Sequence, residues 1–206
     1  MERKNLLLVG AGGHARSCIN IIEQFDEYNI VGLIGLPEQL NTSVSGYRVI
    51  GTDSDLSLFI NKYQYAFVTV GQIKSSETRS LLFKKINQIG FSVPLIISKL
   101  AYVAPDAVIN QGTIVMHGVI INSGSKIGSN CIINTNALIE HDVHVGNDVH
   151  VSTGAIINGS VVVGNSTFLG SGSIVKQGIK IGDECFVGMG TRVIRDLVNG
   201  EKLVTE

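Results

Sequence analysis

The chain has few charged residues and few cysteines. Asp, Glu, Lys and Arg make up only 16% of its 206 residues, which is typical of a protein that buries much of its surface, as in an oligomer. The three cysteines, Cys18, Cys131 and Cys185, are an odd number at wide spacings. They argue against a disulfide framework and favour a reducing compartment.

Features of membrane proteins and of nucleic-acid-binding proteins are also missing. No apolar run approaches the length that spans a bilayer, and no signal peptide precedes Leu6. We therefore expect no membrane insertion and a cytoplasmic location. The net charge of −1 gives no basic field, so we expect no nucleic-acid partner.

What the chain does have is a strict repeat. An aliphatic residue occupies every sixth position from Val103 to Val193, sixteen times without a slip or an insertion. Neither a helix period of 3.6 nor simple alternation along long strands produces this spacing. Period six is typical of a hexapeptide β-helix, in which three hexads make one triangular coil. The spacing predicts an all-β parallel β-helix over residues 99–206, with the repeats ending at about 195 and their aliphatic residues pointing inward.

Two other hexad positions carry a preference. The residue two before the aliphatic one is mostly small, which suits a site near a corner of the coil. The residue directly after it is often Gly or Asn, as at Gly128, Asn134 and Gly146. Because these two residues tolerate a left-handed backbone, we expect the tight turn at that position.

Residues 1–98 follow a different pattern, in which short apolar runs alternate with helical spacing. We predict strands over residues 5–9, 30–34, 65–70 and 93–97. Helices are expected after the first glycine loop, after Asp53 as a cap, and after Ser75 or Ser76, with Gly90 closing the last one. This alternation predicts a small α/β domain with a largely parallel sheet.

One corner of the repeat departs from the small-residue pattern. Ile139 is followed by Glu140, His141 and Asp142. An imidazole can accept a proton near neutral pH, and an adjacent carboxylate can orient it, so the run is a candidate for general-base catalysis. The competing interpretation is a solvated corner without a chemical role.

These segments resemble the sugar O- and N-acetyltransferases of the NeuD and PglD type, and the resemblance covers nearly the whole chain. Its most specific part runs from Ile133-Asn134-Thr135 through Ile139-Glu140-His141-Asp142 to Val149-His150-Val151-Ser152. Further matching segments are Gly10-Ala11-Gly12-Gly13-His14-Ala15, Gly46-Tyr47-Arg48-Val49-Ile50-Gly51 and Val70-Gly71.

The resemblance implies a Rossmann-like α/β domain over residues 1–98 that binds a sugar nucleotide, followed by a left-handed β-helix acetyltransferase domain over residues 99–206. It also implies acetyl-CoA as co-substrate, no metal, and a homotrimer with active sites between subunits. The expected reaction is direct transfer of acetyl to an amino group of a nucleotide-activated amino sugar for surface-glycan synthesis.

The resemblance also implies roles for single residues. His141 matches the base that removes a proton from the sugar, and Asp142 matches the group that holds it. His150 matches a residue near the acetyl group. The remaining matches are Gly159, Ser171 and Met189 along acetyl-CoA, and Gly12, Gly13, His14, Gly71 and Asn134 for the sugar substrate.

The chain departs from the family at two places. Family members carry acidic residues after the second strand, where this chain has Leu33-Ile34-Gly35-Leu36. The nucleotide, if any, therefore stays open, and the same absence counts against NAD. The C-terminal tail lacks the Gly-x-Pro-Ala segment that lies over the coenzyme in the family.

Three other functions stay open from the sequence. One is O-acetylation of sialic acid or a similar nonulosonic acid. A second is a β-helix metal site like that of carbonic anhydrase, with ligands among His117, His141, His144 and His150. The third is an inactive binding subunit.

Overall fold

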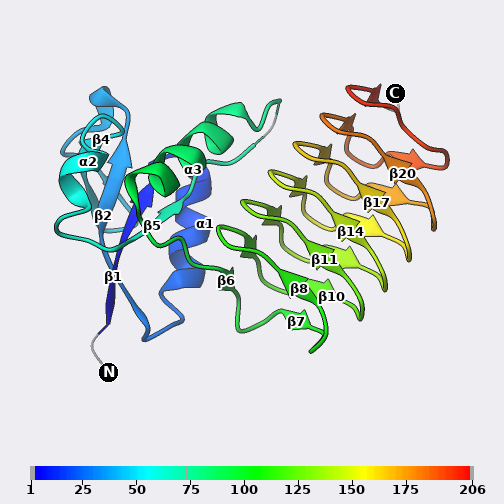
Figure 1. The fold of residues 1–206 in the computed structure, drawn as a ribbon, viewed down its shortest axis with the longest axis horizontal. Helices are drawn as coiled ribbons and strands as arrows, with labels where there is room; N and C mark the ends of the chain where they lie inside the picture. Colours follow the sequence, from blue (N-terminus) through cyan, green and yellow to red (C-terminus); the bar gives the residue numbers. More distant parts are fainter. Residues whose placement is uncertain (1–2, 73, 205–206) are drawn as a thin grey trace. The chain divides into compact units, whose positions relative to one another are not determined.

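The computed structural model describes residues 3–72 and 74–204. The chain forms two compact units, which are coloured along the sequence in Figure 1. The first, the N-terminal unit, contains the residues up to Gly71 together with Glu77–Ile96. The second, the β-helix unit, contains Gln72–Ser76 and the residues from Ile97 onward.

The N-terminal unit is built on a five-stranded sheet with strand order β3-β4-β2-β1-β5. All neighbouring strands are parallel except the antiparallel pair of β3 and β4. The elements are β1 Lys4–Val9, α1 Gly13–Ile22, β2 Tyr28–Gly35, the 3-10 turn η1 Pro37–Gln39, β3 Ser43–Val44, β4 Tyr47–Thr52, α2 Leu56–Phe59, β5 Tyr65–Val68 and α3 Glu77–Ile89.

The predicted core of this unit is confirmed. Residues 6–9 of β1, which lies between β2 and β5, are at most 1% exposed, as expected for a strand of a parallel sheet covered on both faces. Helix α1 buries Ala15, Cys18, Ile19 and Ile22. Gly90 closes α3 with a φ of +103°. The α/β prediction therefore holds for the element types and for the parallel sheet.

Several boundaries were predicted wrongly. Asp53 does not cap α2, because the N-cap residue of this helix is Asp55. The Asp55 carboxylate accepts hydrogen bonds from the Thr52 backbone N–H at 2.8 Å and from the Thr52 hydroxyl at 2.9 Å. The expected strand over residues 93–97 is reduced to β6 Ile96–Ile97, since Pro94 has no N–H to donate. Strands β3 and β4 were not predicted.

The β-helix unit consists of two-residue strands that stack into three parallel sheets, here called faces 1, 2 and 3. Face 1 contains β7 Tyr102–Val103, β10 Ile120–Ile121, β13 Leu138–Ile139, β16 Ile156–Ile157, β19 Ile174–Val175 and β22 Arg192–Val193. Face 2 contains β8 Val108–Ile109, β11 Lys126–Ile127, β14 His144–Val145, β17 Val162–Val163 and β20 Lys180–Ile181. Face 3 contains β6 Ile96–Ile97, β9 Ile114–Val115, β12 Ile132–Ile133, β15 His150–Val151, β18 Phe168–Leu169, β21 Phe186–Val187 and β23 Lys202–Leu203.

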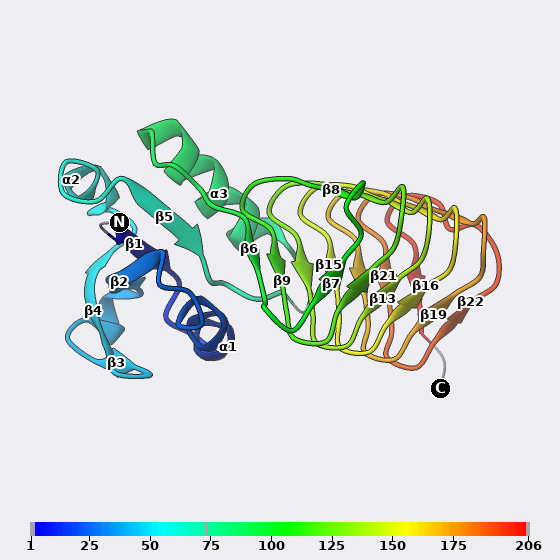
Figure 2. The ribbon, with the colours of Figure 1, turned by 90° about the horizontal axis from the view of Figure 1, so that it is seen from below.

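Each strand pairs in register with the strand one coil further along, as Ile120 does with Leu138. Figure 2 shows the successive coils side by side. The hexad aliphatic residues from Val115 to Val193 are at most 5% exposed, which confirms the inward-pointing core. The first, second and third corners are the turns that follow strands of faces 1, 2 and 3.

The position of the tight turn was predicted wrongly. The left-handed backbone lies three residues after the hexad aliphatic, as at Asn130, Asp142 and Gly154, and not directly after it. The glycines directly after the hexad aliphatic instead allow adjacent coils to approach each other closely. A Cβ on Gly128 would lie 2.5 Å from the Gly146 carbonyl oxygen, so no side chain fits between these coils.

From Thr113 onward, the residue two before each hexad aliphatic is buried. Cys131 and Cys185 occupy this position and are at most 2% exposed. Thr113, Ser125 and Thr167 use their hydroxyls to donate to carbonyl oxygens of the corners at 2.8 Å, which satisfies groups that would otherwise be buried without a partner. In the part of the chain that the structure describes, no helix is both long and apolar enough to cross a membrane.

Candidate active site

His141 and Asp142 form the first corner after strand β13. Asp142 has a φ of +58°, a conformation that aspartate tolerates better than most residues, and its N–H donates to the Ser123 carbonyl of the coil before at 2.9 Å. Its carboxylate Oδ2 lies 2.9 Å from Nδ1 of His141. The two side chains are 54% and 66% exposed, so the outer imidazole nitrogen, Nε2, is reachable from solvent.

The residue one coil further along at this corner is Gly159, and it makes room for the imidazole. A Cβ on Gly159 would lie 2.6 Å from Nε2 of His141. Glu140 is held elsewhere, because its Oε2 accepts a hydrogen bond from the Asn122 amide at 3.0 Å. Of the two acids beside His141, only Asp142 therefore contacts the ring.

His150 lies on face 3 and is 7% exposed. Its Nδ1 is 3.0 Å from the Gln72 carbonyl oxygen, and its Nε2 is 3.3 Å from the Asn134 amide nitrogen. A carbonyl can only accept, so the ring hydrogen is on Nδ1 and Nε2 accepts from Asn134. Phe168 packs edge-on against the ring at 5.2 Å between centroids. These contacts fix the orientation of the His150 ring.

Ser171 and Met189 belong to the third corner, one coil apart. The Ser171 hydroxyl is 2.9 Å from that of Ser152, the residue that follows strand β15. Met189 is 81% exposed, which is unusual for a large apolar side chain. Of the residues matched to the coenzyme, the structure thus places these two at one corner, His150 on the adjoining face, and Gly159 at the corner of His141.

The sequence-predicted residues of the N-terminal unit gather at the start of α1. Gly12 is the N-cap of this helix, and a Cβ on Gly12 or Gly13 would meet nothing within 4 Å. A Cβ on Gly71 would lie 3.2 Å from the Cβ of His14. Burial, and then the positive charge of Arg79, lower the pKa of His14 to about 4, so this imidazole is neutral at physiological pH.

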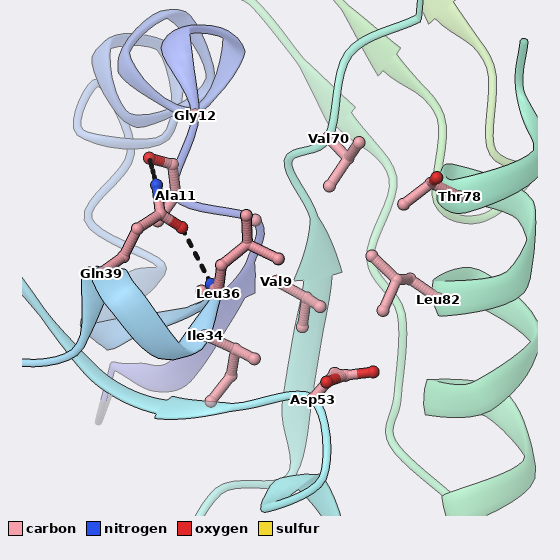
Figure 3. A pocket seen from close by; sticks show the side chains of 12 residues that line it. Val9, Ala11, Gly12, Ile34, Leu36, Gln39, Asp53, Val70, Thr78 and Leu82 are labelled. Atoms are coloured by element: carbon pink, nitrogen blue, oxygen red, sulfur yellow. Dashed lines mark hydrogen bonds between the residues drawn. The ribbon is translucent and has the colours of Figure 1, made fainter.

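A pocket of about 310 Å³ opens beside this loop, at the carboxyl ends of the parallel strands. Figure 3 shows how its side chains lie. Gln39 bridges two loops, because its Oε1 accepts from the Leu36 N–H at 2.9 Å and its Nε2 donates to the Ala11 carbonyl at 3.2 Å. The lining residues are Val9, Gly10, Ala11, Gly12, Ile34, Gly35, Leu36, Gln39, Asp53, Val70, Thr78 and Leu82.

Only Gly12 of the predicted substrate residues lines this pocket. Sequence reasoning missed Gln39, Asp53 and Thr78 as lining residues. Asp53 follows strand β4 directly, so the rule that ligands bind outside the carboxyl ends of parallel strands would have pointed to it had β4 been predicted.

The other histidines do not form a shared site within the described part of the chain. His117 is 2.7 Å from the Ser98 hydroxyl, and His144 lies exposed on face 2 in register with Lys126. Among the described residues, no three side chains of the His, Cys, Asp and Glu types are grouped so that they could hold a metal.

Two family profiles match the sequence. The PglD N-terminal domain matches residues 5–86, and the hexapeptide repeat of succinyl-transferase matches residues 160–195. Comparison with curated proteins found no significant match.

Solved structures match over almost the full length. A variant of perosamine N-acetyltransferase from Caulobacter crescentus, with one histidine replaced by asparagine and bound to CoA and GDP-perosamine, is 31% identical at a TM-score of 0.91. The alignment covers 98% of this chain and 93% of that one. This chain belongs to the PglD-like family of sugar acetyltransferases.

Two further structures are similar over almost the full length of the chain. The acetyltransferase domain of PglB from Neisseria gonorrhoeae, bound to acetyl coenzyme A, is 27% identical at a TM-score of 0.90, over 99% of this chain and 97% of that one. WeeI from Acinetobacter baumannii, at 21% identity and a TM-score of 0.86 over 98% and 97% of the two chains, shares the fold. The PglD-like acetyltransferase described here thus has the predicted left-handed β-helix.

Proposed function

We propose that this acetyltransferase moves the acetyl group of acetyl-CoA to an amino group of a nucleotide-activated amino sugar, in the synthesis of a surface glycan. Support comes from the relatives, which were crystallised with CoA and GDP-perosamine or with acetyl-CoA. The contact between Nδ1 of His141 and the Asp142 carboxylate, at 2.9 Å, supports the proposal further. We propose that the reaction takes place in the cytoplasm, because an odd number of cysteines at wide spacings favours a reducing compartment.

The contact between His141 and Asp142 carries the proposal. With Asp142 on Nδ1, His141 has its Nε2 lone pair free to accept a proton. The sugar nitrogen attacks the thioester carbonyl carbon, and the carbon–sulfur bond breaks as the new amide bond forms. His141 accepts the proton that the nitrogen loses and returns one to the departing sulfur of CoA. No covalent enzyme intermediate is required.

The two units take different parts of the reaction. In this proposal the domain of residues 1–98 binds the sugar nucleotide through Gly12, Gly13, His14 and Gly71. The domain of residues 99–206 binds acetyl-CoA, with Gly159, Ser171 and Met189 along the coenzyme and with His150 and Asn134 near the acetyl group and the sugar. The pairing of Asn134 with His150, and of Ser171 with Ser152, supports these assignments.

We propose that the enzyme is a homotrimer with its active sites between subunits. Within one chain, His141 lies at the first corner, whereas Ser171 and Met189 lie at the third. In a trimer, the third corner of one subunit can lie next to the first corner of another, which would bring Ser171 and Met189 of one chain near His141 of the other. Face 1 also exposes apolar side chains outward, with Tyr102, Ile120 and Ile174 between 39% and 57% exposed.

A transfer assay tests the proposed function. The full-length protein is incubated with acetyl-CoA and, separately, a GDP-linked 4-amino sugar, a UDP-linked 4-amino sugar and sialic acid. Release of the CoA thiol is followed together with the product mass. Acetylation of a nucleotide-linked amine is expected. Acetylation of sialic acid alone would replace the proposal with the O-acetyl alternative, and failure to bind acetyl-CoA in calorimetry would indicate an inactive subunit.

A further inference from the structure

The pocket of the N-terminal unit has apolar walls. Val9, Ile34 and Leu36 lie on one side of it, and Val70 and Leu82 on the other (Figure 3). Its volume of about 310 Å³ lies within the range of small-molecule sites. Apolar walls of this kind suit the faces of a flat ring system, which lose little by leaving water. An aromatic base fits these walls better than a hydroxyl-rich sugar does.

Few polar side chains line this pocket. They are Gln39, Asp53 and Thr78. Both ends of the Gln39 amide are already used to hold the loops that carry Leu36 and Ala11. The one charged group is therefore the carboxylate of Asp53, which is 60% exposed and lies 3.5 Å from the ammonium of Lys85 on α3. That lysine holds Oδ2 and so orients the carboxylate.

A carboxylate can only accept hydrogen bonds, so it selects a ligand edge that presents donors. Guanine presents two adjacent donors, the ring N1–H and the exocyclic amine, which match the two oxygens of a carboxylate. Uracil presents a single N–H between two carbonyl oxygens, and those oxygens repel a carboxylate. We infer that this pocket binds the guanine base of a GDP-linked sugar and that Asp53 determines the preference for guanine over uracil.

The start of α1 offers a site for the diphosphate of such a nucleotide. Gly12 both lines the pocket and caps the N-terminus of α1, where a Cβ would meet nothing within 4 Å. The free N–H groups of the first helical turn favour an anion there. A nucleotide whose base enters the apolar pocket can thus place its phosphates at the helix start, and its sugar beyond them.

The inference rests on the proposed use of a nucleotide sugar, and calorimetry on the full-length protein tests it separately. Free GDP, UDP and IDP are titrated into the wild type, Asp53→Asn and Glu38→Gln. IDP carries a hypoxanthine base that lacks the exocyclic amine of guanine. Glu38 is a matched control because its carboxylate is exposed and outside the pocket lining.

GDP is expected to bind the wild type more tightly than UDP or IDP. Asp53→Asn is expected to weaken the binding of GDP about 10- to 100-fold, which is the usual contribution of hydrogen bonds to a charged group. The affinity for UDP is expected to change little. Glu38→Gln is expected to behave as wild type. UDP binding at least as tightly as GDP, or an equal loss for GDP and UDP in Asp53→Asn, would overturn the inference and leave the transfer reaction standing. Binding of none of the three nucleotides would contradict the proposed nucleotide-sugar function as well.

Discussion

His141 depends on two neighbours of opposite character. Asp142 contacts Nδ1 at 2.9 Å, and Gly159 leaves the space that Nε2 occupies. A carboxylate beside a histidine is visible in the sequence, and so was predicted. The need for glycine one coil further along follows from the register of stacked coils. The resemblance implies that Gly159 lies along the coenzyme, and the structure adds that a Cβ at this position would meet Nε2 of His141.

A substitution at Gly159 separates these two roles. In Gly159→Ala the new Cβ would lie 2.6 Å from Nε2 and displace the imidazole, so kcat is expected to fall about 10-fold or more, and the proposed contact with the coenzyme is expected to raise the KM for acetyl-CoA as well. Steady-state kinetics with varied acetyl-CoA measure both constants. An unchanged kcat would contradict the role of Gly159 in leaving space for the His141 imidazole.

His14 gives the stability of the protein a pH dependence. The pKa of His14 is about 4 in the folded chain, below its ordinary value of 6.5, chiefly because burial disfavours the charged form. The unfolded chain therefore takes up a proton first as the pH falls. The stabilisation is complete above about pH 6.5 and is lost progressively towards pH 4.

We expect the Tm to fall from pH 7.5 to pH 5, and to fall less in His14→Asn. Scanning calorimetry at both pH values measures this difference. His144→Asn is the control, because His144 is exposed on face 2. An identical pH dependence in wild type and His14→Asn would show that His14 does not contribute.

At the scale of the elements, the strands of the β-helix could be predicted from the sequence, because one buried side chain per strand recurs every six residues. The turn was misplaced because glycine has two uses that a sequence does not separate. Gly154 supplies a left-handed turn, whereas Gly128 and Gly146 allow adjacent coils to approach.

The second corner offers a test of close approach between coils. A Cβ on Gly146 would lie 2.8 Å from Oδ1 of Asn165, the atom that accepts the Asn147 N–H at 2.8 Å. Gly146→Ala is therefore expected to lower the free energy of unfolding by about 1–3 kcal/mol. Lys176→Ala, at the same hexad position but exposed on the first corner, is expected to change it by less than about 0.5 kcal/mol. Equal stability of the two variants in thermal unfolding would contradict the explanation that glycines directly after the hexad aliphatic allow adjacent coils to approach.

At the scale of the whole molecule, the sequence indicated an α/β unit followed by a β-helix, and both are present. The pocket of the N-terminal unit could not be predicted from the sequence. Gly12, Asp53 and Leu82 follow or cover different strands, and they meet only because β1, β4 and β5 end at the same edge of one sheet. Patterns local in sequence predict elements well, whereas a site built from several elements requires the strand order.

Replacement of His141 tests the proposed chemistry. His141→Ala is expected to lower kcat by about 10²–10⁴-fold, the usual contribution of a general base. Its affinity for CoA in calorimetry and its Tm are expected to stay near the wild-type values, and His144→Ala is expected to turn over normally. Near-wild-type turnover by His141→Ala, with folding and CoA binding intact, would contradict the assignment of His141 as the base.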